Sequence, residues 1–303
     1  MQAAQGKVTL VGAGPGDPEL LTIKALKAIE AADVLLIDDL VNPEILALAP
    51  STARVIQVGK RGGCESTPQE FIERLMIAEA RAGQHVVRLK GGDPYLFGRG
   101  GEERAQLRAH GIAVEVVPGI SSGLAAPATL GVPLTHRAWS QGAVFVTGHG
   151  KDAASEPNWA ALAQSGLTLV VYMGVARCEA IQAGLLAGGA KPDTPVAVVQ
   201  SATRAHQRQL LTTLGQLPAA LRDSGLGSPS IIVIGDVVRC ADDWQDLAEL
   251  APPPALEQPA VGHAASPGIR FFVTSRDAAL TPASQGSDPV RGLTPTVAFR
   301  VAG

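Results

Sequence analysis

The residues from Val86 to Glu103, VVRLKGGDPYLFGRGGEE, combine glycines and charged side chains in a density that suits a binding or catalytic site better than a core. The glycines allow positive φ angles and leave backbone N–H groups accessible, so a ligand can approach the main chain closely. Asp93 follows a predicted strand, and open α/β sheets bind ligands at the carboxyl ends of their strands. Arg99 and Glu102 are one helical turn apart where a loop becomes a helix, so they can face one pocket and pair.

A second glycine-rich turn, near the N-terminus, raises the alternative of a nucleotide-binding oxidoreductase. The stretch VTLVGAGPGDP is followed by VLLID, so that glycines come after one predicted strand and the acid Asp38 ends the next, as in NAD(P)-binding proteins. However, Asp17 stands where the third glycine of that fingerprint belongs, and Pro15 removes a backbone N–H where a pyrophosphate needs a donor. NAD(P) binding is therefore the less favoured alternative.

Composition and charge limit the possible functions. The 303 residues suffice for about two domains, and 46% of them are hydrophobic, which is typical of an α/β protein. The net charge of −3 gives no overall basic field for nucleic acid or for an anionic membrane. The cysteines show no metal-ligand spacing, and the chain has neither a signal peptide nor an apolar run long enough to span a membrane. We therefore expect a cytoplasmic protein without a bound metal.

Alternating strands and helices must position these residues. Apolar runs predict strands at 7–12, 33–38, 54–58, 85–89 and 113–117, and helical spacing predicts helices at 19–32, 68–82, 101–110 and about 121–130. Such alternation favours a largely parallel sheet. Further strands are predicted at 143–147, 167–173, 196–200 and 230–237, with helices between them.

The chain divides into three parts. We place a first α/β domain at residues 1–138 and a second α/β domain at residues 139–250. Residues 251–303 are rich in proline, alanine and serine, and within them only 269–274 has the pattern of a strand. We expect this tail to be disordered.

Seven motifs in order carry a resemblance to a known family. They are GAGPGDPELLT (12–22), GKRGG (59–63), RLKGGDPYLFGRGGEE (88–103), VVPGISSG (116–123), GVPLTHR (131–137), VTGH (146–149) and VYMG (171–174). Over residues 7 to about 245, the chain resembles the tetrapyrrole methylase family. The resemblance implies the class III methyltransferase fold, in which S-adenosylmethionine (SAM) lies in the cleft between two α/β domains, and it implies a homodimer.

The resemblance also implies an activity. SAM-dependent methylation of uroporphyrinogen III at C2 and then C7 would give precorrin-2, which feeds the synthesis of sirohaem, cobalamin and haem d1. The alternatives are a methylase of the same fold that acts on a later corrin intermediate, or on ribosomal RNA, although no basic stripe for RNA is evident. SAM carries an activated methyl group, so the enzyme must align donor and acceptor and manage one proton, and no metal is needed.

The motifs also imply roles for particular residues. By the resemblance, the SAM-binding residues are Pro15, Gly91, Gly92, Asp93, Leu96, Ser121, Ser122, Met173 and Ala202, and the residues that bind substrate carboxylates are Arg61 and Arg137. The catalytic candidates are Asp38, Lys60, Arg99 and Glu102. An arginine is an awkward base because its pKa exceeds about 12, so we interpret Arg99 as an electrostatic group and assign the proton to Asp38 or Glu102. His136 and His149 are expected to be structural.

Overall fold

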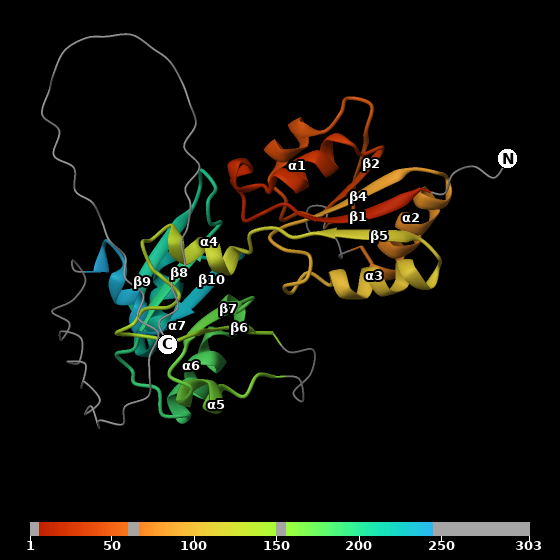
Figure 1. The fold of residues 1–303 in the computed structure, drawn as a ribbon. Coiled ribbons are helices and arrows are strands. Elements are labelled where there is room, and N and C mark those ends of the chain that lie inside the picture. The colour runs from red at the N-terminus through yellow and green to blue at the C-terminus, as the bar shows by residue number, and fades with distance from the viewer. Residues whose placement is uncertain (1–5, 60–66, 150–155, 245–303) are drawn as a thin grey trace, which may run out of the picture. The chain divides into compact units, whose positions relative to one another are not determined.

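Two five-stranded sheets form the framework of the protein, which is described by a computed structural model (Figure 1). The structure describes residues 6–59, 67–149 and 156–244. The predicted tail at 251–303, with its expected strand, and the site candidates Lys60 and Arg61 lie outside the described residues. Within the described ranges, no helix is long and apolar enough to cross a membrane.

The first sheet is parallel throughout. Its strands are β1 (Lys7–Gly12), β2 (Val34–Ile37), β3 (Arg54–Gln57), β4 (His85–Lys90) and β5 (Ala113–Val117), in the order β3-β2-β4-β1-β5. The helices of this half are α1 (Ile23–Glu30), α2 (Gln69–Arg81) and α3 (Gly100–Ala109). The parallel sheet predicted from alternating strands and helices is confirmed for this half of the chain.

The two faces of the first sheet pack against different helices. Val86 on β4 belongs to a hydrophobic cluster that includes residues of α2 and α3. Val87 and Leu89 belong to the cluster that includes residues of α1. Because side chains alternate along a strand, Arg88 and Lys90 lie on the same face as Val86, which is the face covered by α2 and α3.

The helix predicted at 19–32 is shorter in the structure. Pro18–Leu20 form a 3-10 helix, η1, and α1 begins only at Ile23. Asp17 and Thr22 each accept a hydrogen bond from a backbone N–H two or three residues later, so each short helix has its own N-cap. The chain is extended between the two helices, and a further 3-10 helix, η2 (Pro43–Leu48), follows β2.

The second sheet is mixed. Its strands are β6 (Ala143–Thr147), β7 (Thr168–Tyr172), β8 (Pro195–Gln200), β9 (Arg208–Thr213) and β10 (Ser230–Ile234), in the order β6-β7-β10-β8-β9. β6 and β7 are parallel, whereas β10 is antiparallel to β7 and β8, and β9 is antiparallel to β8. The helices of this half are α4 (Ser122–Ala128), α5 (Trp159–Gln164), α6 (Cys178–Ala187) and α7 (Leu217–Ser224), with 3-10 turns η4 (Val175–Arg177), η5 (Leu214–Gln216) and η6 (Asp236–Cys240).

The sequence pattern missed one strand and overextended another. β9 lies at the edge of the second sheet and pairs with β8 alone, and none of its residues is fully buried. Its sequence, RQLLTT, therefore lacks the apolar run that marked the buried strands. The strand predicted at 230–237 ends at Ile234, where Gly235, with a φ of 144°, leads into η6.

α4 packs against the second sheet, although it lies within the predicted first domain, 1–138. It contacts β7, β8 and β10, and Figure 1 shows it beside β8 and β10. Ala126, Leu130 and Val132 share a hydrophobic cluster with residues of these strands, such as Val170. The packing therefore changes from the first sheet to the second between β5 and α4, ahead of the boundary placed at 138.

Three loops at the carboxyl ends of β1, β4 and β5 come into close backbone contact. A Cβ atom on Gly12 would lie 2.5 Å from the backbone nitrogen of Gly119, and one on Gly119 would lie 2.3 Å from the carbonyl oxygen of Gly92. Such separations leave no room for a side chain, so Gly12 and Gly119 must be glycine. We refer to Gly12, Gly92 and Gly119 as the glycine joint.

We expect Gly119→Ala to lower the free energy of unfolding by about 1–3 kcal/mol, because the added methyl group forces two packed backbones apart. Gly101→Ala is the matched control, since a Cβ at Gly101 meets nothing within 4 Å. Urea unfolding followed by circular dichroism measures both variants. Equal unfolding midpoints for the two would contradict the tight packing of the glycine joint.

Candidate functional site

The loops after β1 and β4 bond to each other through two glycines. Gly14 donates its N–H to the carbonyl oxygen of Gly92 (3.2 Å), and Gly92 donates its N–H to the carbonyl oxygen of Gly14 (2.7 Å). Both have positive φ, 73° at Gly14 and 68° at Gly92. Pro15 follows Gly14, and Gly91 precedes Gly92. The structure thus brings together the two glycine-rich turns that the sequence analysis identified separately.

Asp93 connects the loop after β4 to the loop after β5. Its Oδ1 accepts a hydrogen bond from the N–H of Tyr95 (2.8 Å), and its Oδ2 accepts one from the N–H of Gly119 (3.1 Å). Bonds from backbone N–H groups to a carboxylate are charge-assisted and stronger than neutral ones. The Asp93 carboxylate therefore stabilises the glycine joint and places a negative charge beside it.

The loop after β8 closes on the loop after β1. Thr203 accepts a hydrogen bond at Oγ1 from the N–H of Asp17 (3.0 Å), and Asn42 donates its side-chain amide to the carbonyl oxygen of Gly16 (2.8 Å). A Cβ on Gly16 would lie 3.0 Å from the carbonyl oxygen of Ala202. Ala202 is itself buried, so the two loops approach each other where both residues are small.

Tyr172, the last residue of β7, connects the second sheet to the start of α4. Its hydroxyl lies 2.6 Å from Ser121 Oγ and accepts a hydrogen bond from the N–H of Gly123 (2.8 Å). The ring of Phe97, from the loop after β4, packs against the Tyr172 ring with 4.8 Å between centroids. Burial raises the pKa of the Tyr172 hydroxyl, although the hydrogen bonds with Ser121 and Gly123 act in the opposite direction.

Backbone strain is concentrated in the same loops. Among the described residues, the non-glycine residues with positive φ are Phe97, Arg99, Met173, Ser201 and Thr203. All of them follow the carboxyl ends of β4, β7 or β8. Such conformations cost about 1–3 kcal/mol each and cluster at functional sites. Their distribution indicates that these loops form a binding or catalytic site.

Arg99 and Glu102 form the ion pair that their spacing predicts. Nε and Nη2 of Arg99 both donate to Oε2 of Glu102, at 3.0 Å and 2.5 Å. The two side chains are 54% and 58% exposed at the start of α3. The hydrogen bond to Glu102 raises the pKa of Arg99 above its already high usual value, so this guanidinium is a permanent cation and cannot serve as a base.

A buried network of Asp38, Arg88, Lys90 and Glu103 links β2, β4 and α3, and of these the sequence analysis singled out only Asp38. Arg88 donates through Nη2 to Asp38 Oδ1 (2.5 Å) and through Nε to Glu103 Oε1 (3.3 Å). Lys90 Nζ lies 3.1 Å from Glu103 Oε1 and 3.7 Å from Asp38 Oδ2. The available signal was the two cations, two residues apart in an otherwise apolar strand, because buried charges require partners.

Two residues of α2 border this network. Gln69 donates its side-chain amide to Glu103 Oε1 (3.0 Å). Burial is the main cause that raises the pKa of Glu73; the negative charge of Glu103 adds to it, while the bond with Gln69 and the charge of Arg99 lower it. The exposed Arg99 and the buried Glu103 therefore act on one common neighbour.

The structure brings most of the predicted SAM-binding residues into one region. The contacts described above, with the close approach of Gly92 to Ser121 and Ser122, connect the loops that hold Pro15, Gly91, Gly92, Asp93, Ser121, Ser122, Met173 and Ala202. Leu96 lies half-buried next to Phe97 in one of these loops. Asp38 adjoins this region because it pairs with Arg88 of β4. Arg99 and Glu102 adjoin it because they lie where the loop after β4 becomes α3. The roles of these residues stay predictions.

Arg137 has no side-chain hydrogen bond or ion pair among the described residues. It lies on an exposed turn, closed by backbone hydrogen bonds between His136 and Ser140, and its carbonyl oxygen accepts a bond from Gln141. Among the described residues, no hydrogen bond or ion pair connects this turn to the loops around the glycine joint, so binding of substrate carboxylates by Arg137 also stays a prediction. His136 accepts a hydrogen bond from the N–H of Ala138, which agrees with a structural histidine.

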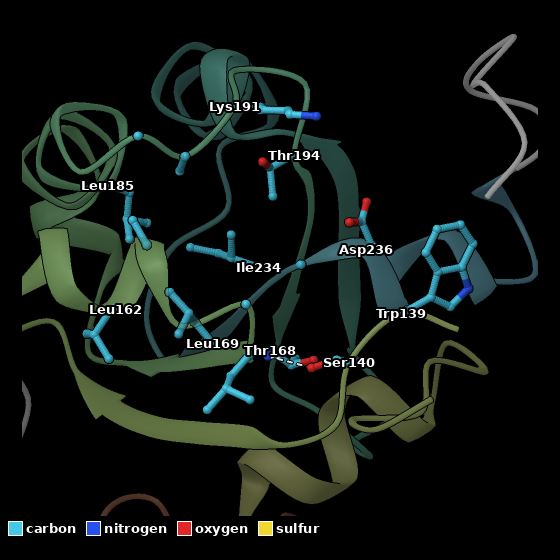
Figure 2. Close-up of a pocket in the computed structure, with 16 residues that line it drawn as sticks. Trp139, Ser140, Leu162, Thr168, Leu169, Leu185, Lys191, Thr194, Ile234 and Asp236 are labelled. Carbon is cyan, nitrogen blue, oxygen red and sulfur yellow. Dashed lines mark hydrogen bonds between the residues drawn. The ribbon is translucent and has the colours of Figure 1, made fainter. Parts of the chain in front are cut away.

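Two pockets of the described structure lie away from these loops. Figure 2 shows one, of about 220 Å³, whose lining includes Thr168, Lys191 and Asp236. These residues lie at the start of β7, before β8 and after β10, so the pocket is at the opposite end of β7 and β8 from Tyr172 and Ala202. The other, of about 340 Å³, is lined by residues of β9, by Thr129 and Leu130 after α4, and by residues 241–243 after η6. Neither contains a predicted site residue.

The described residues contain no group of three or more His, Cys, Asp or Glu side chains that could hold a metal ion. The charges near the glycine joint are instead paired with one another, as Arg99 with Glu102 and Arg88 with Asp38. The chemistry available to these loops is therefore that of positioned backbone groups, an exposed cation and anchored carboxylates.

Comparison with known proteins identifies the family. Residues 7–218 match the family described as Tetrapyrrole (Corrin/Porphyrin) Methylases. The chain is 59% identical, over 237 residues, to a uroporphyrinogen-III C-methyltransferase from Pseudomonas aeruginosa, and the match covers 77% of this chain and 95% of that protein. It is 52% identical to a siroheme synthase from Tolumonas auensis over 79% of this chain, but it spans only 51% of that protein.

Solved structures agree with this assignment. Uroporphyrin-III C-methyltransferase from Thermus thermophilus, in complex with S-adenosylhomocysteine, matches with a TM-score of 0.66 and 43% identity over 77% of this chain and 99% of that chain. A cobalt precorrin-4 methyltransferase matches with a TM-score of 0.69 and 30% identity over 77% of this chain and 95% of that one. The chain belongs to the tetrapyrrole methylase family, and the predicted family and α/β fold are confirmed.

We expect Tyr172→Phe to weaken the binding of S-adenosylhomocysteine about tenfold. The substitution leaves Ser121 Oγ and the N–H of Gly123 without a buried partner, which costs about 1–3 kcal/mol and loosens the start of α4. Tyr95→Phe is the matched control, because its side chain is largely exposed. Calorimetric titration measures both affinities. A folded Tyr172→Phe variant that binds as tightly as the unsubstituted protein would show that this contact does not support the site.

Proposed function

We propose that the protein is a SAM-dependent uroporphyrinogen-III C-methyltransferase. The observation that carries the proposal is the 59% identity to an enzyme of that activity, over 95% of its length. The family match over residues 7–218 also includes every residue predicted for the site. Relatives of the siroheme synthase type, of which the chain spans about half, support the same class of substrate.

The loops around the glycine joint fit the methyl donor. SAM, when bound, supplies a methyl group that is already activated on a positively charged sulfur. Positive φ at Gly14, Gly92 and Met173 turns the chain sharply after β1, β4 and β7, so the main chain leaves regular secondary structure where we place the cofactor. Asp93 adds a carboxylate whose position is fixed by two backbone hydrogen bonds. We assign the cofactor to these loops, together with Pro15 and Ala202.

Arg99 suits an acceptor that carries carboxylates. It is a permanent cation, its side chain is half exposed, and it stands where the loop after β4 becomes α3. A guanidinium can bind a carboxylate through two parallel hydrogen bonds, which orients the acceptor as well as attracting it. We propose that Arg99 binds the tetrapyrrole, with Arg61 and Arg137 as further partners of its carboxylates and Glu102 as the residue that orients Arg99.

We assign the acceptance of the proton to Asp38. Transfer of a methyl cation leaves a positive charge on the tetrapyrrole, which is neutralised by loss of a proton from another atom of the macrocycle, and a group that takes this proton must be held in place. The Asp38 side chain is 28% exposed and bonds to the buried Arg88, so its position is fixed while one part remains accessible. Glu102 is 58% exposed and paired with Arg99, which makes it less rigid. Lys60 is a further candidate for handling the proton.

The finer assignments follow the family resemblance. We propose that methylation occurs at C2 and then at C7, giving precorrin-2 for sirohaem, cobalamin or haem d1. We also propose that the protein acts as a homodimer in the cytoplasm and has neither nucleic acid nor a membrane as a partner.

Incubation of the full chain with SAM and anaerobically generated uroporphyrinogen III, followed by mass spectrometry of the product, tests the activity. We expect a gain of two methyl groups per macrocycle. Methylation of a later corrin intermediate, with none of uroporphyrinogen III, would support the alternative within the family. Binding of NAD and not of S-adenosylhomocysteine would refute methyl transfer altogether.

We expect Arg99→Ala to lower kcat about 100-fold or more, because an electrostatic and orienting group is lost from the acceptor side. Its affinity for S-adenosylhomocysteine should stay within about threefold, since Arg99 is not assigned to the cofactor. Arg222→Ala is the matched control: it removes another exposed arginine, which pairs with Glu179 at 2.9 Å in the second half of the chain. If Arg99→Ala instead loses cofactor affinity and keeps kcat at saturation, the assignment of Arg99 to the acceptor is wrong.

A further inference from the structure

We propose that Arg88, Lys90 and Glu103 are positioning residues, which hold the Asp38 carboxylate and the first turn of α3 at a fixed separation. The inference rests on the methyl-transfer function proposed above, because it concerns how the acceptor side of that site is organised. It assigns no contact with substrate to the three residues. They act through Asp38, which follows β2, and through Arg99 and Glu102 at the start of α3.

Glu103 is the centre of the network. Its side chain is fully buried, and its Oε1 accepts hydrogen bonds from Arg88 Nε (3.3 Å), Lys90 Nζ (3.1 Å) and Gln69 Nε2 (3.0 Å). The three donors come from β4 and α2, whereas Glu103 belongs to α3. One carboxylate oxygen therefore fastens the start of α3 to the sheet and to a neighbouring helix.

Arg88 extends this connection to Asp38. Its side chain is only 2% exposed, and its Nη2 lies 2.5 Å from Asp38 Oδ1. Lys90, 5% exposed, lies 3.7 Å from the other carboxylate oxygen of Asp38. Asp38 immediately follows β2, so β4 supplies the link between the carboxylate after β2 and the helix that begins at Arg99 and Glu102.

Stability alone gives no reason for so many buried charges. Removing ions from water is costly, and a well-packed apolar core of similar volume is often as stable or more stable. In the described structure Arg88 Nη1 and Glu103 Oε2 are also buried without a hydrogen-bond partner, which adds to the cost. An arrangement that fixes direction and distance between charged groups is the benefit that an apolar core cannot provide.

The exposed pair needs this support. The side chains of Arg99 and Glu102 are more than half exposed, so their mutual bond can orient the guanidinium but adds little stability. Glu103, the next residue, is fully buried and anchored to two cations. The first turn of α3 thus carries an exposed charged pair next to a buried and anchored carboxylate.

A double-mutant cycle tests the inference. Arg88→Met with Glu103→Gln removes one positive and one negative charge, so the opposite charges of the remaining Asp38 and Lys90 still balance. This paired change is made in the unsubstituted protein and in Asp38→Asn. Lys24→Met with Glu115→Gln is the matched control, because it removes an exposed ion pair of the same half of the chain, with N and O 2.6 Å apart.

We expect the paired change to lower kcat about 10–100-fold in the unsubstituted protein, because a small misplacement of a catalytic group costs that much. The KM for uroporphyrinogen III and the Kd for S-adenosylhomocysteine should change less than about threefold. In the Asp38→Asn background the same change should lower kcat several-fold less, since one of the groups through which it acts is already lost. Arg88→Lys, which keeps the charge, should retain part of kcat. The control pair should leave kcat unchanged.

An equal loss of kcat in both backgrounds would overturn the inference, because it would show a general structural effect. An unchanged kcat in the unsubstituted background would overturn it as well. If the paired variant does not fold, Arg88→Lys alone is taken through the same cycle and must show the same dependence on Asp38. Failure of the unsubstituted protein to methylate uroporphyrinogen III is a different result, which would refute the proposed function itself.

Discussion

The close backbone contact at Gly12, Gly92 and Gly119 is the constraint on which the rest of the site depends. Only where side chains are absent can the loops after β1, β4 and β5 touch through their main chains. That contact lets Asp93 reach the N–H of Gly119. The loops of the second sheet then join through Thr203 and Tyr172.

β4 serves both sides of the proposed reaction. Its carboxyl end runs into Gly91, Gly92 and Asp93, which we assign to the cofactor. Its inward side chains Arg88 and Lys90 hold the carboxylates on the acceptor side. β4 lies between β2 and β1, so it is hydrogen-bonded to a neighbouring strand along both edges. The same strand therefore positions the residues assigned to the methyl donor and those assigned to the acceptor.

Local patterns in the sequence predicted the features that local residues determine. The parallel first sheet, the glycine-rich turns and the Arg99–Glu102 pair each depend on residues close together in the chain, or on the alternation of elements. The sequence pattern did not predict β9, because an edge strand needs few apolar residues. The helix expected at 19–32 is shorter because Asp17 and Thr22 each cap a separate short helix there. In both cases the local signal was weak or divided.

The remaining features depend on partners far away in the chain. Glu103 becomes a buried anchor only because α3 packs over β4, and the Tyr172 hydroxyl matters only because Ser121 meets it across 51 residues. α4 follows β5 directly yet packs on the second sheet. The sequence motifs identified the segments that meet, but they did not show which charged side chains are buried between those segments.

A crystal structure of the protein with S-adenosylhomocysteine tests the central claim most directly. We predict the ligand against Gly91, Gly92 and Asp93 and beside Ala202, at the carboxyl ends of β4 and β8, with Arg99 left free for the acceptor. A ligand in the pocket of Figure 2, or at any site away from the glycine joint, would contradict the assignment of these loops to the methyl donor.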